Sequence, residues 1–253
     1  MKKISVLLAL MALFFADFAL ANAVVTAAAG SVQVQTGPAA ARTLRQGDEV
    51  NQGDTISTGP SSSVVLKFDD GQVAALTSNS RMTITAYQYN AQSGAGNVLL
   101  SLIGGGMRAI TGLIGHRSPS QVTYRAATAT IGIRGTDVTI ATDGGDVVVT
   151  VTEGSIIFTF AGKSIIIPAG QGVNAKADGT FQQSAAAQII QQLPPGLAAA
   201  IGGLQGLNNA IQQAGPGNPR SGTDQDQGQS GPNNQVGPNT GPGSTGGGSA
   251  SKR

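Results

Sequence analysis

The chain has 253 residues, with 15 lysines and arginines, 13 aspartates and glutamates, one histidine and no cysteine. The absence of cysteine excludes disulfide bonds, thiolate catalysis, zinc–thiolate sites and iron–sulfur clusters. The net charge of +2 is spread without blocks, unlike the clustered basic stripe that neutralises the phosphates of nucleic acid. We therefore expect no nucleic-acid partner, and stability that comes from packing alone.

Residues 1–23 have the pattern of a secretory signal peptide. Lys2 and Lys3 form a short positive region, and an apolar run follows. Two overlapping Ala-x-Ala patterns end at Ala21 and Ala23, and we favour cleavage after Ala23. The alternative is an uncleaved membrane anchor, but the apolar run is shorter than the roughly 20 residues that span a bilayer. The sequence thus predicts an exported mature chain without a transmembrane helix. We favour the periplasm as its location, with the cell surface or the exterior of the cell as alternatives.

Residues 24–182 are predicted to form a single all-β domain. Short β-branched runs alternate with glycine-containing turns about every 8 to 12 residues, the spacing typical of all-β folds. Turns are expected at Asp70-Gly71, Asp143–Asp146, Glu153-Gly154 and Ala161–Lys163. Tryptophan is absent and three of the seven phenylalanines lie in the signal peptide, so the core must consist mainly of valine, isoleucine, leucine and alanine. This pattern leaves two architectures open, a sandwich and a solenoid-like roll of short rungs.

The carboxy-terminal part divides into a helical segment, residues 184–214, and a tail, residues 215–253. One helix face carries the apolar residues Leu197, Ile201, Leu204 and Ile211, because their offsets are four, seven and fourteen. Pro194-Pro195 separates this helix from an earlier helical piece. The apolar face must be buried, either as cover for a sheet edge, which we favour, or on a partner or membrane surface. The tail is rich in glycine, proline, asparagine and glutamine, so we predict that it is disordered.

No catalytic constellation is recognisable in the sequence. His116 is the only histidine, it lies in a polar stretch with glycine, and no Gly-x-Ser-x-Gly elbow occurs, so we interpret it as a solvated loop residue. Gly162-Lys163-Ser164 resembles the end of a phosphate-binding loop. Ile157 stands where such a loop requires glycine, which favours a hairpin turn instead.

Two aspartate pairs are conceivable calcium ligands, Asp69 with Asp70 and Asp143 with Asp146. Neither pair has the dense spacing of oxygen ligands that a calcium loop needs, and aspartate beside glycine is ordinary turn chemistry. We therefore expect no metal, no cofactor and no enzymatic activity.

The most unusual stretch is Ala129–Val138, in which Gly132 and Gly135 bracket Arg134 within an apolar, β-branched run. Glycine permits tight backbone angles and close approach, so the stretch predicts a strand that turns a corner around Arg134. The guanidinium group could hold strand-end carbonyls or Asp137, or it could meet an acidic ligand. We favour the structural role and predict that Arg134→Ala costs about 1 to 3 kcal/mol of stability. An unchanged melting temperature with lost partner binding would instead make this corner the recognition site.

Several short motifs follow one another along residues 24–173. They are Gly30–Val34, Gly47-Asp48, Gly53–Gly59, Asp70-Gly71, Gly106–Gly112, Ala129–Thr136, Glu153-Gly154 and Ala169–Gln171. Together they resemble the FecR-type extracytoplasmic domain family. The most distinctive is Ala-Thr-Ile-Gly-Ile-Arg-Gly-Thr, whose residues Gly132, Arg134, Gly135 and Thr136 we interpret as a structural family motif. Ala126-Ala127 stand where many relatives are expected to carry Thr-Pro.

The resemblance implies an exported all-β module. The family's namesakes are transmembrane regulators: their periplasmic part reads the signalling domain of an outer-membrane iron-siderophore transporter, and a cytoplasmic domain controls a sigma factor. This sequence begins instead with a signal peptide and shows neither an anti-sigma domain nor a membrane helix behind it. We therefore expect a stand-alone, non-enzymatic binding or scaffold protein whose partner is an envelope protein or polysaccharide. The alternative is a periplasmic sensory component of iron-siderophore transporter or sigma-factor signalling.

Overall fold

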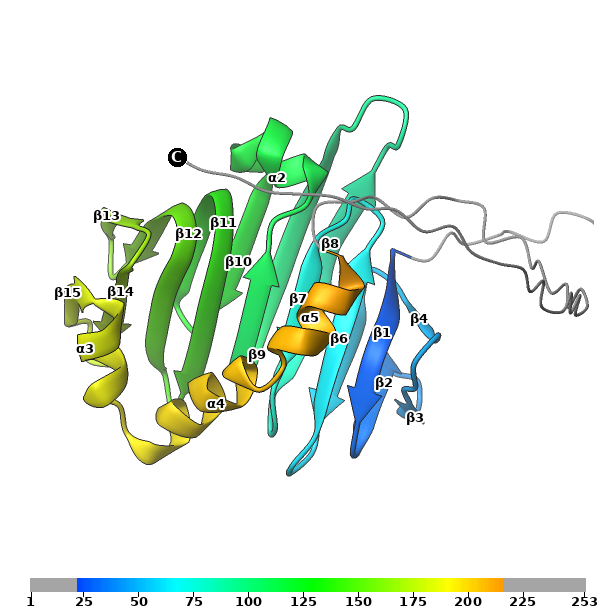
Figure 1. The fold of residues 1–253 in the computed structure, drawn as a ribbon, viewed down its shortest axis with the longest axis horizontal. Coiled ribbons are helices and arrows are strands. Elements are labelled where there is room, and N and C mark those ends of the chain that lie inside the picture. The colour runs from blue at the N-terminus through cyan, green and yellow to red at the C-terminus, as the bar shows by residue number, and fades with distance from the viewer. Residues whose placement is uncertain (1–21, 216–253) are drawn as a thin grey trace, which may run out of the picture. The chain divides into compact units, whose positions relative to one another are not determined.

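The computed structural model describes residues 22–215, so most of the expected signal peptide and nearly all of the expected tail lie outside the described residues. Fifteen strands of the described part join in one hydrogen-bonded sheet (Figure 1). The strands are β1 (Ala23–Ala29), β2 (Val32–Thr36), β3 (Arg42–Thr43), β4 (Glu49–Val50), β5 (Asp54–Thr58), β6 (Ser63–Phe68), β7 (Val73–Leu76), β8 (Arg81–Tyr89), β9 (Gly96–Ile110), β10 (Val122–Ala126), β11 (Ala129–Asp143), β12 (Asp146–Phe160), β13 (Lys163–Pro168), β14 (Gln171–Ala175) and β15 (Phe181–Ala185). The helical elements are α2 (Leu113–Arg117), the 3-10 turn η2 (Pro119–Gln121), α3 (Ala186–Gln191), α4 (Pro195–Gln205) and α5 (Asn208–Ala214). The expected all-β class is confirmed.

The sheet folds over itself into two layers, because the long strands β9, β11 and β12 each place one half in either layer. One layer, which we call the open layer, has the order β2-β5-β8-β9-β10-β11-β12-β13. The other, the covered layer, has the order β4-β1-β6-β7-β9-β11-β12-β14-β15. Of the two architectures left open by the sequence, the layers correspond to a sandwich, but one built from a single continuous sheet.

The core lies between the two layers and follows the period of two that strands impose. Along β9, for example, Val98, Leu100 and Leu102 are buried and their neighbours face outward. The core consists mainly of valine, isoleucine, leucine and alanine, as the composition predicted. Aromatic contacts join the layers: the rings of Phe68 on β6 and Tyr87 on β8 have their centroids 5.1 Å apart.

Each of the three long strands changes layer at a glycine with positive φ. These residues are Gly105 on β9 (φ +83°), Gly135 on β11 (φ +59°) and Gly154 on β12 (φ +74°). The expectation of a corner in the Gly132–Gly135 stretch is confirmed, and β11 has a register shift between Arg134 and Asp137. The expected turn at Glu153-Gly154 is wrong, because β12 continues through these residues. Gly154 bends the strand without reversing it, since the strand stays paired with β11 on both sides of the bend.

The other expected turns are confirmed as hairpins. Asp70-Gly71 joins β6 to β7, Asp143–Asp146 joins β11 to β12, and Ala161–Lys163 joins β12 to β13. The reading of Gly162-Lys163-Ser164 as a hairpin rather than a phosphate loop is therefore confirmed.

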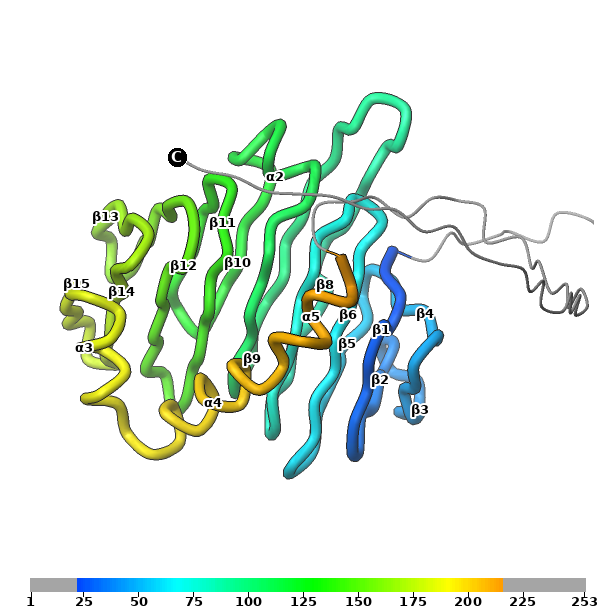
Figure 2. Tube along the Cα trace, viewed as in Figure 1, coloured from blue at the N-terminus to red at the C-terminus, as the bar shows by residue number. Residues whose placement is uncertain are grey.

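The carboxy-terminal helices pack on the outer side of the covered layer (Figure 2). The predicted apolar face is buried there, through Leu197, Ile201, Leu204 and Ile211. The helices cover the face of the layer rather than a sheet edge. Strand β15 ends at Ala185, so the β domain extends three residues past the expected boundary at residue 182. None of the helices in residues 22–215 is long and apolar enough to cross a membrane.

Close packing of α4 on the sheet explains the glycine at position 203, although glycine lowers the stability of a helix. A Cβ atom added to Gly203 would lie 2.0 Å from the hydroxyl oxygen of Thr77. A side chain at this position would have to displace the Thr77 side chain or move the helix away from the sheet. Gly203 therefore makes α4 less stable by about 1 kcal/mol than alanine would, but it allows α4 to pack closely on the covered layer.

The corner can be tested with two alanine substitutions at glycines of similar φ. A Cβ at Gly154 would lie 2.0 Å from the carbonyl oxygen of Gly135, whereas a Cβ at Gly162 would meet nothing within 4 Å. Gly162→Ala should lower the free energy of unfolding by about 1 to 2 kcal/mol, the usual cost of a left-handed alanine. Gly154→Ala adds a backbone clash and should cost on the order of 4 kcal/mol. Equal losses in urea denaturation would contradict this explanation of the corner.

Candidate functional site

The residues of the predicted family motif separate into buried and exposed positions. Thr136 is buried, and its backbone N–H donates to the Thr111 hydroxyl oxygen over 2.8 Å. That hydroxyl in turn donates to the Thr136 carbonyl oxygen over 2.9 Å. Gly135 provides the positive φ of the corner. Gly132 is half-buried, and an added Cβ would make only ordinary contacts with Ile157.

Arg134 itself is exposed, although Ile131, Ile133 and Val138 around it are buried as expected. Among residues 22–215 its side chain forms no hydrogen bond or ion pair, so neither the carbonyl contacts nor the Asp137 contact that the sequence suggested is present. The Asp137 carboxylate is bound by Arg108 instead, with Nε 2.8 Å from Oδ1 and Nη2 2.5 Å from Oδ2. Arg134 is therefore a surface residue, and none of its guanidinium N–H groups donates to another residue of the described chain.

Arg108 is the structural arginine that sequence reasoning missed. It lies on β9 beside the corner, and its Nη1 also donates to Oδ1 of Asn208 at the start of α5. The hydrogen bond to Asp137, more than any other influence, raises the pKa of the Arg108 guanidinium above its usual value. The two residues lie 29 positions apart, and only the pairing of β9 with β11 brings them together.

Asp70 is a hairpin-turn residue, as predicted, but it is completely buried. Its Oδ1 accepts from the backbone N–H of Gln72 (3.1 Å) and from the Tyr87 hydroxyl (3.2 Å). Its Oδ2 accepts from the N–H of Ile114 in α2 (3.3 Å), and a Cβ at Gly112 would lie only 2.4 Å from this oxygen. The carboxylate thus joins the β6–β7 turn, β8 and α2 at one end of the core.

The charge state of this cluster is shifted by burial. Desolvation raises the pKa of the Asp70 carboxyl above 3.8, and its hydrogen bonds only partly oppose this. Burial also raises the pKa of the Tyr87 and Tyr124 hydroxyls, with Asp70 adding to the shift. Tyr124 donates to Oε1 of Gln72 over 3.0 Å. These groups are enclosed in the core and form an internal polar network, not a surface site.

Two further residues that the sequence singled out are His116 and Asp146. His116 is exposed, but in the short helix α2 rather than in a loop. Asp146 binds Nζ of Lys176 (2.8 Å) and the N–H of Ala177 (3.0 Å), and the first of these contacts is the main cause of its lowered pKa. Within residues 22–215 no three histidine or carboxylate side chains gather where they could hold a metal ion.

The surface that the helices leave uncovered is the outer side of the open layer, which we call the open face. Strand register aligns one row of its side chains across seven strands: Thr55, Thr83, Ser101, Arg125, Thr130, Thr159 and Ser164. Neighbouring hydroxyls form hydrogen bonds, for example Thr55 with Thr83 and Thr159 with Ser164, each over 2.9 Å. The open face is thus a regular array of hydroxyl groups interrupted by arginine.

Three arginines are exposed on the open face, Arg81, Arg125 and Arg134. None of them forms an ion pair with a described residue. Asp54, the only carboxylate within the strand segments of the open layer, is buried and accepts from the Thr36 hydroxyl and the Asn51 N–H. Glu153 is exposed at the corner, where it pairs in register with Asp137. The open face is therefore positively charged.

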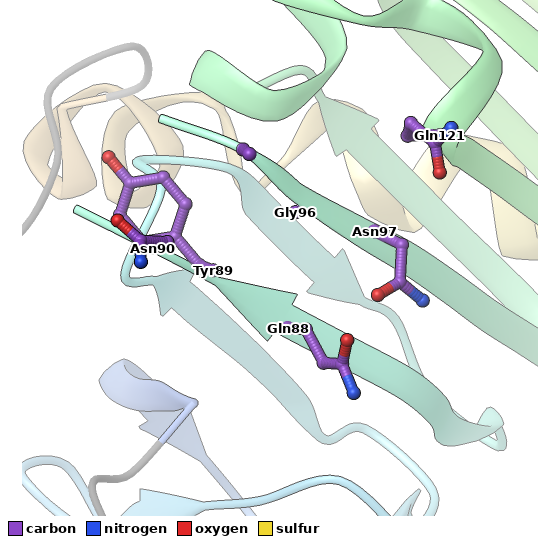
Figure 3. Close-up of a pocket in the computed structure, with 7 residues that line it drawn as sticks. Gln88, Tyr89, Asn90, Gly96, Asn97 and Gln121 are labelled. Atoms are coloured by element: carbon purple, nitrogen blue, oxygen red, sulfur yellow. The ribbon is translucent and has the colours of Figure 1, made fainter. Parts of the chain in front are cut away.

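A notch lies at the edge of the open face, with a volume of about 530 Å³. Figure 3 shows its polar side chains: Gln88 and Asn97 project from the neighbouring strands β8 and β9, and Gln121 comes from η2. Tyr89 and Asn90 complete one end. Every polar side chain of the notch is uncharged, and most are amides, which both donate and accept hydrogen bonds.

A second cavity, of about 380 Å³, lies between the helices and the covered layer. Arg108, Thr139 and Thr150 form its floor as register neighbours, and Ile190, Ile201 and Leu204 line its helical side. The Arg108 charge is already compensated by Asp137. The notch and the open face have more unused polar groups, and they are the better candidate site.

The structure thus defines the class of this protein as an all-β domain, with one folded sheet and one exposed polar face. The family model described as "FecR protein" matches residues 54–156, from the start of β5 into β12. Residues 54–156 are therefore similar to the FecR family, and the resemblance inferred from the motifs is confirmed over these residues. The matched region contains Asp70, the corner glycines Gly135 and Gly154, and all three open-face arginines.

Two crystal structures, at 2.50 Å and 1.65 Å resolution, of a "putative anti-sigma factor" from Parabacteroides distasonis ATCC 8503 are similar to this chain at 13% identity. Their TM-scores are 0.43 and 0.42. Each comparison covers 52% of this chain and 59% of the other, so this chain spans under two thirds of their length. No curated protein matches the sequence.

Asp70 predicts a specific pH dependence of stability. Because its pKa is raised in the folded state, the folded protein binds a proton more tightly than the unfolded chain does. The resulting stabilisation is complete below the unfolded pKa and is lost as the pH rises through the folded pKa. In Asp70→Asn this contribution disappears, so the unfolding free energy of wild type minus that of the variant should increase as the pH is lowered from neutral toward the unfolded pKa of 3.8. The measurement is urea denaturation of both proteins over this pH range. If their unfolding free energies change with pH by the same amount, Asp70 does not titrate as described.

Proposed function

We propose that this chain is an exported, non-enzymatic binding protein of the bacterial envelope, and that its open face contacts the partner. The observation that carries the proposal is the contrast between the two outer faces. Helices α3, α4 and α5 bury the covered layer, whereas the open face keeps three exposed arginines and rows of hydroxyl groups. Exposed charged and polar groups without an internal partner are typical of recognition surfaces. The FecR family is regulatory, which agrees with a binding role.

The proposal of export rests on the signal-peptide pattern, and the folded domain supports cleavage after Ala21 rather than Ala23. Asn22 has three hydrogen bonds: its N–H donates to Asn51 Oδ1 (3.3 Å), its Oδ1 accepts from Gln52 N–H (2.6 Å) and its carbonyl accepts from Asp69 N–H (3.2 Å). Ala23 is fully buried. Cleavage after Ala23 would remove Asn22 and also Ala23, the first residue of β1, whereas cleavage after Ala21 would preserve both.

Amino-terminal sequencing of the exported protein tests this site. We expect Asn22 as the first residue, and Ala21→Arg should abolish or displace the cleavage, because the position before the cut requires a small residue. A mature protein that starts at Val24 would refute the proposed site. One that still starts at Met1 would refute export by a cleaved leader.

The open-face contact can be tested by retention of envelope components on the immobilised exported chain. Ile157 and Ile166 are register neighbours on the open face, and changing both to glutamate places two negative charges there. The matched control changes Gln212 and Gln213, exposed on α5, to glutamate. Wild type and control should retain the same component, and the open-face variant should retain at least about tenfold less, a difference of 1.4 kcal/mol. No retention by wild type, or equal retention by both variants, would refute the proposed contact.

The FecR domain also supports a second role, as a detached periplasmic component of iron-transporter or sigma-factor signalling. In this case the open face would contact a signalling protein. Deletion of the gene should then change the expression of iron-uptake genes during iron starvation. Unchanged expression in the deletion strain would leave the binding or scaffold role as the supported one.

A further inference from the structure

We infer that the open face binds an acidic polysaccharide, with arginines holding its carboxylates and the notch holding its sugar hydroxyls. The inference rests on the proposed function, because it names the ligand class of the same face. It depends on three features of the described residues: uncompensated positive charge, a regular array of hydroxyl groups, and an amide-lined notch beside one of the arginines.

Charge determines the sign of the ligand. Arg125 and Arg134 project from the adjacent strands β10 and β11, and Arg81 lies at the start of β8 in the same layer. Arginine binds carboxylates with two parallel hydrogen bonds, which add geometric specificity to the charge attraction. A neutral ligand would leave these three groups without a counter-charge.

The spacing of the polar groups favours an extended polymer. The row from Thr55 to Ser164 crosses seven strands, with neighbours about 4.8 Å apart. Hydroxyl groups both donate and accept hydrogen bonds, as sugar hydroxyls do. A polysaccharide chain that lies across the strands meets a repeated set of complementary partners, with an arginine in the middle of the row.

The scarcity of apolar anchors argues against a protein partner for this face. Protein interfaces depend on buried aromatic and large apolar side chains near their centre. On the open face the large apolar side chains that are well exposed are Ile103, Ile157 and Ile166, and only the last two are register neighbours. Aromatic side chains are absent from its central rows among the described residues.

The notch extends the hydroxyl array toward Arg134. Gln121 lies two residues before Thr123, whose partner on β11 is Gly132, and Arg134 lies two residues beyond Gly132. Asn97 and Gln121 line the notch (Figure 3). The register of β10 with β11, continued by two residues, places Arg134 on the strand next to Gln121. A uronic acid unit has the matching combination, one carboxylate and several hydroxyls on one ring.

Binding of the full exported chain to defined polymers tests the inference. The probes are polygalacturonate and alginate, which are polyuronates, with dextran as the neutral polysaccharide and polyglutamate as the acidic polypeptide. Calorimetric titration should show polyuronate binding that weakens with added salt and no binding of dextran. Arg125→Gln and Arg134→Gln should each weaken polyuronate binding at least about tenfold. The matched control, Arg45→Gln, removes an exposed arginine from the turn between β3 and β4 and should leave binding unchanged.

A second pair of substitutions separates sugar recognition from charge alone. Asn97→Ala combined with Gln121→Ala removes notch amides without changing charge, and should weaken polyuronate binding while polyglutamate binding stays as it is. Melting temperatures should remain near that of wild type for all these variants, since the side chains are exposed or half-exposed. The unchanged melting temperature of Arg134→Gln also distinguishes recognition from the structural role expected from the sequence.

Three results would overturn the inference: no binding to either polyuronate, equal losses in Arg45→Gln and the open-face variants, or polyglutamate binding as tight as polyuronate binding. If the open face retains an envelope component but binds neither polyuronate, the ligand class is wrong and the proposed function stands. If nothing is retained and nothing is bound, both fail together.

Discussion

The glycine corner is the constraint on which the rest of the structure depends. Gly135 and Gly154 meet so closely that a Cβ on the latter would lie 2.0 Å from the carbonyl oxygen of the former. This contact lets β11 and β12 pass from one layer to the other while remaining paired on both sides of the bend. Because a single sheet supplies both layers, the two outer faces have fixed positions relative to the same core. One face is then available for helices and the other for solvent.

Charged groups are distributed according to this division. Asp70 is inside the core and is satisfied by backbone donors and Tyr87. Asp137 lies beneath the helices and is neutralised by Arg108 through two hydrogen bonds. Breaking such a pair by removing one partner leaves an uncompensated buried charge, which is strongly destabilising. Asp70 and Asp137 are thus committed to the fold, whereas the Arg134 guanidinium forms no hydrogen bond or ion pair with either of them.

Local sequence patterns predicted the elements that depend on neighbouring residues. The Asp70-Gly71 and Ala161–Lys163 turns, the divided helical segment and the buried helix face all follow from turn chemistry and helical period. The predicted turn at Glu153-Gly154 is wrong because glycine permits both a reversal and a bend. The difference lies in the partner strand, which a local pattern does not contain. The expected contact of Arg134 with Asp137 is absent for the same reason, since the arginine that binds Asp137 is Arg108 on β9.

The sequence by itself determined the all-β class, the FecR resemblance and the importance of the stretch around Gly135, because these follow from composition, periodicity and motif order. Only the tertiary structure decided which arginine stabilises the corner and which faces solvent. It also decided that Thr55, Arg125 and Ser164 share one row although they are far apart in the chain. Register between strands creates such a row, and register is a property of the folded sheet as a whole.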